Sequence, residues 1–501
     1  MDVASTSATP VGALTFADDG NRAYLSRQVR SGRALRLAPG IYAVGATLPP
    51  ERVVYEYRFR LIAHYWPGAV LCDQTALKGG EPLDGWMFIC HPDPTRTSDL
   101  VLPGLSIAVR LGPAALPGDM PAPEGLYFSG PVRTLVENIP GPGRPAQDRP
   151  PRAAGVTAVE DRLDSEARTG GAGRISNMLN QLDVIGHYLP TPAVDLVRRR
   201  LAGLLGTVTG GPPASERLRA RLSGQPYDQH RIEMFQQFVT LLTDTAPTPR
   251  PAIGPAERWA WLPFFEAYFS NFIEGTQFSV DEARRIAIEG QESAGRPEDS
   301  HDVRATYRLA THPVHSTATA RTSAEFLDLL REQHALLLAA RPDKRPGMLK
   351  EQRNYAGGYA FVDPDLLNGT LTRGFDLLAP VTDAFQRAAA LMLLITECHP
   401  FDDGNGRLAR LVANATLSAT GQVRLVIPTV YRNDYLAGLS SVSNRAGRGE
   451  ALLAVLGFAQ KWTANVDWSG YDRADADMTV SNAYLDAGTA ERLGNRLRLP
   501  N

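Results

Sequence analysis

Two proline-rich stretches set the strongest limits on what this chain can fold into. GPGRPAQDRPPRAAG occupies residues 141–155 and TAPTPRPAIGP occupies residues 245–255. Because proline lacks a backbone N–H and is disfavoured inside helices and central strands, both stretches predict extended linkers. They divide the 501 residues into three blocks. A chain of this length exceeds what a single hydrophobic core usually organises, so we expect several domains.

The first two blocks differ in the periodicity of their apolar residues. Residues 1–140 combine a short helical stretch near 22–31 with apolar runs that we expect to be strands, including residues 53–65 and 104–112. The middle block, residues 156–244, has only helical spacing. We therefore expect an α+β N-terminal domain followed by a helical middle block.

Helices also dominate the last block, which we divide into a domain at 256–465 and a helical tail at 466–501. One stretch in it, residues 357–364, is predicted to be extended. Capping boxes predict two helix starts, at Ser279 with Glu282 and at Thr322 with Glu325. The predicted fold class is therefore mostly α.

Composition excludes several classes of protein. Hydrophobic residues make up 43% and charged residues 21%, with a formal net charge of −2, so no overall attraction to nucleic acid or anionic lipid is expected. No apolar run could span a bilayer, and the first residues lack a signal-peptide pattern. Cys72, Cys90 and Cys398 are too few and scattered for a disulfide framework or a four-ligand zinc site, and we interpret them as core residues. We expect a soluble cytoplasmic protein without membrane partners.

The residues that carry chemistry are concentrated after position 383. The stretch DAFQRAAALMLLITEC is apolar on nearly every side and predicts a buried helix that ends just before His399. The following DDGNG contains helix breakers, and helical periodicity resumes at Arg407 and continues to Gly421. The segment is therefore predicted to be helix, loop, helix.

The loop and the start of the second helix suit phosphate groups. Backbone N–H groups of Gly404, Asn405 and Gly406 would gather at a helix N-terminus, where the helix dipole also favours anions. Arg407 and Arg410 lie three residues apart, so both side chains can reach the same loop with forked, charged donors. Several phosphates could be held there.

Two further side chains complete the chemistry of this segment. Asp403 offers a carboxylate, the kind of ligand that nucleotide-bound Mg²⁺ prefers. His399, as a histidine with an ordinary pKa near neutrality, can accept a proton from an attacking hydroxyl. A base, a metal ligand and phosphate-binding groups thus lie close together in the sequence.

The string HPFDDGNGRLAR resembles the signature of the Fic family at every defined position. The resemblance implies a helical Fic core that transfers AMP from ATP, with Mg²⁺, to a Ser, Thr or Tyr hydroxyl of a target protein and releases pyrophosphate. It implies that His399 is the base and that Asp403 binds Mg²⁺. Asn405 and Arg407 would hold the α- and β-phosphates, and Arg410 would meet the γ-phosphate.

Fic proteins also resemble one another in a hairpin upstream of the signature, and PGMLKEQRNYAGGYAFVDP, starting at Pro346, is similar to it. The resemblance implies a β-hairpin flap whose edge aligns an extended target segment by main-chain hydrogen bonds. Lys350 stands where many family members have Arg. An ordinary surface hairpin is the alternative. We expect the target to contact the hairpin tip, at Tyr355, Ala356, Gly357 and Gly358.

The segment SNFIEGT resembles the family's inhibitory pattern through Ser270, Glu274 and Gly275. The resemblance implies that Glu274 pairs with Arg410 in place of the γ-phosphate, so that ATP binds unproductively. A carboxylate within the chain competes at high effective concentration, and the inhibition should be partial. A solvated carboxylate at a helix end is the alternative. Downstream, Tyr435 could border the adenine, with core packing as the alternative.

Residues 22–45 predict a helix with Arg27 and Arg30 on one face, followed by two short strands around Pro39, as in a recognition helix and wing. Together with HYWPGAVLCDQTAL and SGPVRTLVENI, the segment is similar to AbiEi-type antitoxin domains, which are DNA-binding regulators. The resemblance implies that this winged-helix-like domain binds DNA or a partner protein. A basic, solvated helix on an interaction domain is the alternative.

The preferred interpretation is an ATP-dependent, autoinhibited protein adenylyltransferase. One rival is a DNA-binding transcriptional regulator or antitoxin in which the Fic domain only senses nucleotide. Another rival keeps the enzyme but changes the reaction, to removal of AMP or to transfer of a different nucleotide.

Overall fold

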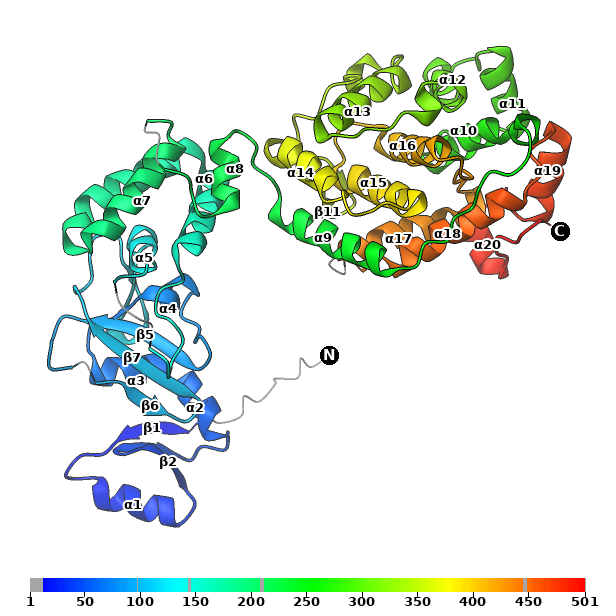
Figure 1. Ribbon diagram of the computed structural model, residues 1–501. Coiled ribbons are helices and arrows are strands. Elements are labelled where there is room, and N and C mark those ends of the chain that lie inside the picture. The colour runs from blue at the N-terminus through cyan, green and yellow to red at the C-terminus, as the bar shows by residue number, and fades with distance from the viewer. Residues whose placement is uncertain (1–11, 97, 143–145, 208–210, 445–447, 501) are drawn as a thin grey trace. The chain divides into compact units, whose positions relative to one another are not determined.

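The structure is a computed structural model that describes residues 12–96, 98–142, 146–207, 211–444 and 448–500. Contacts divide the chain into two compact units, one ending at Leu222 and one beginning at Ser223 (Figure 1). The division lies inside the helical block expected at 156–244. The described residues of both proline-rich stretches lie outside helices and strands, and residues 143–145 of the first stretch lie outside the description. No helix in the described ranges is long and apolar enough to cross a membrane.

The first unit begins with a small antiparallel sheet and one helix. Strand β1 (Ala13–Phe16) pairs with β3 (Ile41–Val44), which also pairs with β2 (Ala34–Ala38). Helix α1 (Arg22–Arg30) lies between β1 and β2 in the sequence. Gly40 has a φ of +80° in the tight turn between β2 and β3, a conformation that glycine adopts without strain. The predicted helix and hairpin are thus present, and a strand precedes the helix.

A second sheet has six strands in the order β6-β7-β5-β4-β9-β8. Its longest strands, β5 (Trp86–His91) and β7 (Leu105–Leu111), run parallel to each other. Most of their apolar side chains are buried, and β7 confirms the strand expected at 104–112. The shorter strands are β4 (Val70–Leu71), β6 (Leu100–Leu102), β8 (Met120–Pro121) and β9 (Tyr127–Phe128).

Residues 53–65 are helical, and the strand prediction for them is wrong. They lie in α2 (Pro50–Glu56) and α3 (Arg58–Tyr65). Alternation of aromatic and charged residues in VVYEYRFRL favoured a strand. The fully buried residues, however, lie in pairs about two helical turns apart, which places them on one face of a helical segment. These residues are Val53, Val54, Leu61 and Ile62.

Helices on both sides of the first proline-rich stretch share one hydrophobic core. Val132 and Val136 of α5 (Pro131–Glu137) pack with residues of α6 (Val156–Ile185) and α7 (Thr191–Leu204). The α+β part and the helices that follow it are therefore one packed unit. Its remaining helices are α4 (Asp73–Leu77) and α8 (Glu216–Leu222).

The second unit is almost entirely helical (Figure 1). Within the described residues of this unit, the only β-hairpin is formed by strands β10 (Tyr355–Ala356) and β11 (Tyr359–Ala360). Its α-helices are α9 (Gln229–Asp244), α10 (Leu262–Ile273), α11 (Val280–Arg284), α12 (Pro297–Thr311), α13 (Ser323–Leu337), α14 (Pro364–Asp376), α15 (Ala384–Cys398), α16 (Asn405–Ala419), α17 (Arg432–Asn444), α18 (Glu450–Asn465), α19 (Tyr471–Val480) and α20 (Ala487–Leu493). Among the described residues of both units, short 3₁₀ or π helices are η1 (Pro123–Gly125), η2 (Gly186–Tyr188), η3 (Ala256–Trp259), η4 (Arg285–Glu289), η5 (His315–Thr317), η6 (Pro342–Lys344) and η7 (Thr429–Tyr431).

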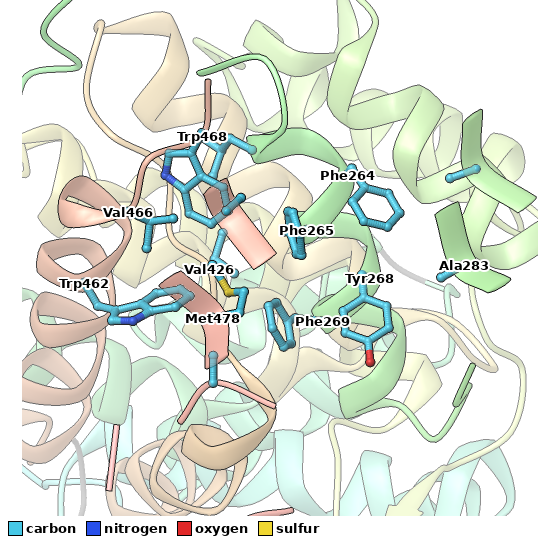
Figure 2. Close-up of a cluster of buried hydrophobic side chains, with 14 of the residues drawn as sticks. Phe264, Phe265, Tyr268, Phe269, Ala283, Val426, Trp462, Val466, Trp468 and Met478 are labelled. Atoms are coloured by element: carbon cyan, nitrogen blue, oxygen red, sulfur yellow. The ribbon is translucent and has the colours of Figure 1, made fainter. Parts of the chain in front are cut away.

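An aromatic core fixes α10, the helix that leads to the predicted inhibitory glutamate. Phe264, Phe265 and Phe269 of α10 are buried, and Figure 2 shows Phe265 and Phe269 facing side chains from the C-terminal part of the chain. Trp468 lies with its ring 5.7 Å from that of Phe265. The C-terminal helical tail is therefore part of this core, and it restricts the movement of α10.

Local signals predicted several helix boundaries in this unit correctly. Helices α15 and α16 pack against each other, and the residues between them form the predicted loop. The hydroxyls of Ser279 and Thr322 accept hydrogen bonds from the N–H groups three residues later, each at 3.2 Å, as the capping boxes predict. The buried faces of α15 confirm that it is a core helix.

Candidate active site

His399 caps α15 in the left-handed conformation, with a φ of +47°. Its Nδ1 lies 3.2 Å from the carbonyl oxygen of Thr396. Because a carbonyl oxygen only accepts, Nδ1 carries the proton and Nε2 keeps a free lone pair. Phe361 stacks on the imidazole with ring centroids 3.9 Å apart, and burial lowers the pKa of His399 to about 4. The ring is therefore neutral at neutral pH and suited to accept a proton.

The DGNG loop forms the N-terminus of α16. Gly404 adopts a φ of +75°, which glycine tolerates, and α16 begins at the next residue. The side chain of Asn405 binds inside the loop, where Oδ1 accepts from the N–H of Phe401 and Nδ2 donates to its carbonyl, each at 2.9 Å. The amide thus fixes the loop, and the backbone N–H groups at the helix start remain the donors for an anion.

Arg407 is held behind the loop by carboxylates of the protein. Its side chain is 3% exposed, and its NH1 lies 2.6 Å from Oδ2 of Asp302 on α12. NH1 also lies 3.4 Å from Oδ1 of Asn271, and NH2 lies 3.8 Å from Oδ1 of Asp403. Arg407 does not line the cavity described below.

Arg410 contacts the segment predicted to be inhibitory. Its Nε donates to Oγ of Ser270 and its NH2 donates to the carbonyl of the same residue, each at 2.9 Å. NH2 also donates to Oε1 of Glu274 at 2.7 Å. The ring of Tyr435, which is buried, lies with its centroid 5.9 Å from the guanidinium carbon. The structure thus brings together Ser270, Glu274, Arg410 and Tyr435.

The carboxylate of Glu274 lies directly over the loop that is predicted to bind phosphate. A Cβ added to Gly406 would lie only 2.1 Å from Oε1 of Glu274, so the carboxylate needs a glycine at this position. Burial raises the pKa of Glu274, but Arg410 outweighs that effect and leaves the pKa below its ordinary value. Gly275, with a φ of +93°, follows α10 and completes the turn. Glu274 is therefore an anion placed where phosphate oxygens are predicted to bind.

A cavity of about 440 Å³ joins these groups. Its walls come from the end of α10, the hairpin, the end of α15, the start of α16 and one face of α17. The volume is typical of sites for small ligands. Predicted site residues in its lining are Glu274, Ala356, His399, Gly406, Arg410 and Tyr435.

The predicted hairpin is present beside this cavity. Tyr355 pairs with Ala360 and Ala356 with Tyr359, and the turn between them is Gly357-Gly358, with a φ of +58° at Gly357. The side chain of Tyr355 is 61% exposed. One edge of this two-stranded pair is therefore available to an extended segment.

Lys350 supports the loop that carries His399. Its Nζ donates to the carbonyl of Cys398 at 3.0 Å and to Oδ1 of Asn354 at 2.7 Å. Burial lowers the pKa of Lys350 to about 8. A buried lysine thus stabilises the loop that carries His399.

Sequence reasoning missed Glu397, Phe361 and Asp302. Glu397 is buried in the cavity wall, where Oε2 accepts a 2.6 Å hydrogen bond from the hydroxyl of Tyr359 and lies 3.2 Å from Nε of Arg231. The sequence did contain a signal for Glu397, because it is a carboxylate near the end of an otherwise apolar helix. The roles of Phe361 and Asp302 depend on distant packing and had no such signal.

Asp403 fits a metal that arrives with a nucleotide. Its side chain is 43% exposed, and Oδ1 accepts from the N–H of Gly404 at 2.6 Å. Mg²⁺ commonly binds to one or two carboxylates and takes its other ligands from phosphates and water, so one carboxylate beside the loop is sufficient.

Another group of metal-type ligands within the described residues is Cys72, Asp73 and Glu137, in the first unit. Arg110 already pairs with both carboxylates, at 3.0 Å and 2.8 Å. That group is therefore an ionic network that disfavours a cation.

Comparisons with known proteins agree with this geometry. A sequence model described as the Fic/DOC family matches residues 325–417. Protein adenylyltransferase fic-1 of Caenorhabditis elegans is 26% identical over 181 residues, which are 35% of this chain and 36% of that protein. Protein adenylyltransferase Fic of Aedes aegypti is 26% identical over 213 residues, 42% of each chain. This chain thus spans less than half the length of these relatives.

Among solved structures, Fic-1 of Caenorhabditis elegans is similar with 19% identity and a TM-score of 0.36, covering 65% of this chain and 98% of that one. The family match runs from α13 to α16 and includes the loop, the hairpin and His399. The chain therefore contains a Fic domain at residues 325–417, and its relatives include proteins named protein adenylyltransferase.

Proposed function

We propose that this chain transfers AMP from ATP to a Ser, Thr or Tyr hydroxyl of a target protein. The observation that carries the proposal is the meeting, in one cavity, of His399 with a free Nε2, the N-terminus of α16 and the guanidinium of Arg410. The names of the similar proteins support the same activity. The exposed hairpin edge at Tyr355 supports a protein as the acceptor.

In the proposed step, Nε2 of His399 takes the proton from the target hydroxyl, and the hydroxyl oxygen forms a bond to the α-phosphorus of ATP. The bond from that phosphorus to the bridging oxygen of the β-phosphate breaks, and pyrophosphate leaves with the electron pair. Backbone N–H groups at the start of α16 and the guanidinium of Arg410 would balance the charge on the phosphates. Mg²⁺ held by Asp403 would supply further positive charge.

Inhibition by Glu274 is part of the proposal. Its carboxylate lies over Gly406 and takes one donor of Arg410, so it occupies acceptor positions that a γ-phosphate would need. The contacts of Ser270 with Arg410 hold the guanidinium in the same orientation. Removal of the carboxylate should therefore free Arg410 for ATP.

The experiment is mass spectrometry of four purified proteins, each incubated with Mg²⁺, ATP and a cell extract. They are the parent, Glu274→Gly, Glu274→Gly with His399→Ala, and Glu257→Gly as the matched control at an exposed carboxylate. We expect AMP addition to rise in Glu274→Gly, to vanish when His399 is also replaced, and to stay at the parent level in Glu257→Gly. Labelled UTP, GTP and CTP beside ATP identify the donor.

Three outcomes would count against this proposal. AMP addition that persists without His399 would remove the base from the mechanism. A rate in Glu274→Gly that does not exceed the parent rate, with the fold intact, would remove the inhibition. Absence of transfer in every sample would favour a nucleotide-sensing regulator.

A second proposal concerns the first unit. Arg27, Arg30, Arg33 and Arg36 are exposed on α1 and the hairpin after it. We propose that this face contacts the phosphate backbone of DNA. Replacing Arg27 and Arg30 with Gln should weaken duplex binding and lower the slope of log affinity against log salt by about two. Unchanged binding would leave a partner protein as the ligand of this unit.

The cytoplasm is the proposed compartment. Cys72, Cys90 and Cys398 are free and buried. Reducing compartments keep thiols in this state, which supports the proposal.

A further inference from the structure

A second cavity in the Fic-containing unit has a strongly basic lining. Its volume is about 380 Å³, and its walls are α12, the C-terminal end of α13 and the turn η5. It shares no lining residue with the cavity around His399. None of the residues predicted from the Fic signature, the hairpin or the inhibitory segment belongs to it.

The polar groups of this cavity are mostly the side chains of arginine and histidine. His301, Arg304 and Arg308 follow each other at intervals of one helical turn and share one face of α12. His312 and His315 continue this face beyond the helix, with ring centroids 4.7 Å apart. The lining thus combines two guanidinium groups with three imidazoles.

The acidic residue in the lining does not balance this charge. Glu292 accepts one hydrogen bond from NH2 of Arg304 at 3.1 Å, and its own side chain is 60% exposed. Nε of Arg304 and Nδ1 of His301 are buried and have no hydrogen-bond partner among the described residues. Burial lowers the pKa of His301, and Arg304 and Arg308 lower it further, although Asp302 opposes them. The site therefore has excess positive charge and nitrogen atoms without acceptors.

We propose that this cavity binds a small molecule that carries a phosphate group. Phosphate oxygens accept hydrogen bonds from the forked donors of Arg304 and Arg308 and offset the repulsion between the two guanidinium groups. Leu309 and Leu336 provide apolar wall for the rest of the ligand. The volume is that of a small-ligand site and is too limited for an extended macromolecular surface. The proposal does not depend on AMP transfer.

The ligand would bind to a helix that also supports the Fic loop. Asp302 follows His301 in the sequence, does not line this cavity and contacts Arg407 at 2.6 Å. Helix α12 thus contacts two different groups, one a side chain of the protein and the other the proposed phosphate.

The test is a titration of the full chain, labelled with ¹⁵N at histidine, with inorganic phosphate as the probe at an ionic strength fixed with sodium chloride. We expect saturable shifts of the His301, His312 and His315 signals, each assigned with a His→Gln variant. Arg304→Gln combined with Arg308→Gln should weaken phosphate binding by about tenfold or more, because charge-assisted hydrogen bonds are lost. The signal of His399 reports separately on the catalytic cavity.

A matched control is Arg331→Gln, which changes an exposed arginine on α13 and should leave the affinity unchanged. Phenyl phosphate should bind more tightly than inorganic phosphate, because its ring can contact the two leucines.

Equal dissociation constants in the parent and the double variant would overturn the proposal, as would shifts that chloride alone reproduces. Phosphate binding without any gain from the phenyl group would overturn the assignment to a ligand with an apolar body. The readout is independent of transfer, so an inactive enzyme does not affect the result.

Discussion

Phe361→Ala should move the acid limb of the pH–rate profile to higher pH. Phe361 covers the imidazole of His399 at a centroid distance of 3.9 Å, and the two rings are nearly parallel. Burial is the largest cause of the lowered pKa of His399, and this cover is a direct part of that burial. Removing the ring lets water reach the imidazole, stabilises its charged form and raises its pKa.

The size of the effect follows from the two limits of the pKa. The pKa of His399 is about 4 in the folded protein and has an ordinary value of 6.5. At pH 6 about 99% of the parent protein carries the neutral base, whereas a fully solvated imidazole would be neutral in about a quarter of the molecules. We therefore expect the rate at pH 6, relative to its own plateau, to fall by up to about fourfold in the variant.

The assay measures the rate of AMP incorporation between pH 4.5 and 8.5, with both proteins carrying Glu274→Gly. Each pH–rate profile is scaled to its own plateau, so that the positions of the acid limbs are compared and not the maximal rates. Phe361→Leu keeps an apolar cover and should show a smaller shift, and Tyr355→Ala removes an exposed aromatic of the same hairpin as a control. A direct titration of His399 by NMR supplies the pKa. Coincident acid limbs and equal pKa values in the parent and Phe361→Ala would refute the argument that this ring keeps the base neutral.

Two further predictions concern stability. The Nδ1 of His334 accepts from the N–H of Gly347 at 2.9 Å and its Nε2 donates to the carbonyl of Asp403 at 3.0 Å, and burial lowers its pKa to about 4. Between pH 6.5 and 4, His334 binds its second proton in the unfolded chain but remains mostly neutral in the folded chain. The free energy of unfolding should therefore drop by about 3 kcal/mol over this range, as measured by urea unfolding. The drop should be smaller in His334→Gln, which cannot bind this proton. Asp302→Ala leaves the buried charge of Arg407 without its main partner and should lower the free energy of unfolding by about 3–5 kcal/mol; a loss below about 1 kcal/mol in thermal unfolding would show that another group compensates.

The helix-loop-helix segment around His399 could be predicted because its signals are local. An apolar helix, a run of helix breakers and renewed periodicity fix α15, the loop and α16 within a short stretch of sequence. The same holds for the hairpin, where the Gly357-Gly358 pair determines the turn. The charge pairing of Glu274 with Arg410 is long-range, and the sequence indicated it only through the family pattern that the resemblance supplied.

The failures have a different physical origin. Aromatic and charged side chains alternate in residues 53–65, and this pattern fits a strand. The buried apolar residues of the same segment lie in pairs two helical turns apart, and this pattern fits helices. Packing against the rest of the domain decides which of the two structures forms. Asp302 and Phe361 reach the site only because α12 packs against α10 and α16 and because the chain after the hairpin lies over the end of α15. No local pattern records such contacts between segments that are far apart in the sequence.

Arg407 and Arg410 show how the fold gives two identical residues different properties. Both are buried guanidinium groups on one helix, three residues apart, and each pairs with a carboxylate from another helix or its end. The partner of Arg407, Asp302, is 1% exposed, so water or ligand phosphate cannot replace it without loss of a buried ion pair. The partner of Arg410, Glu274, is 33% exposed and lies at the end of α10, where rotation of one side chain into the cavity separates the pair. We therefore expect exchange between carboxylate and phosphate at Arg410 only, and we expect Arg407 to keep its ion pair with Asp302 whether or not nucleotide is bound.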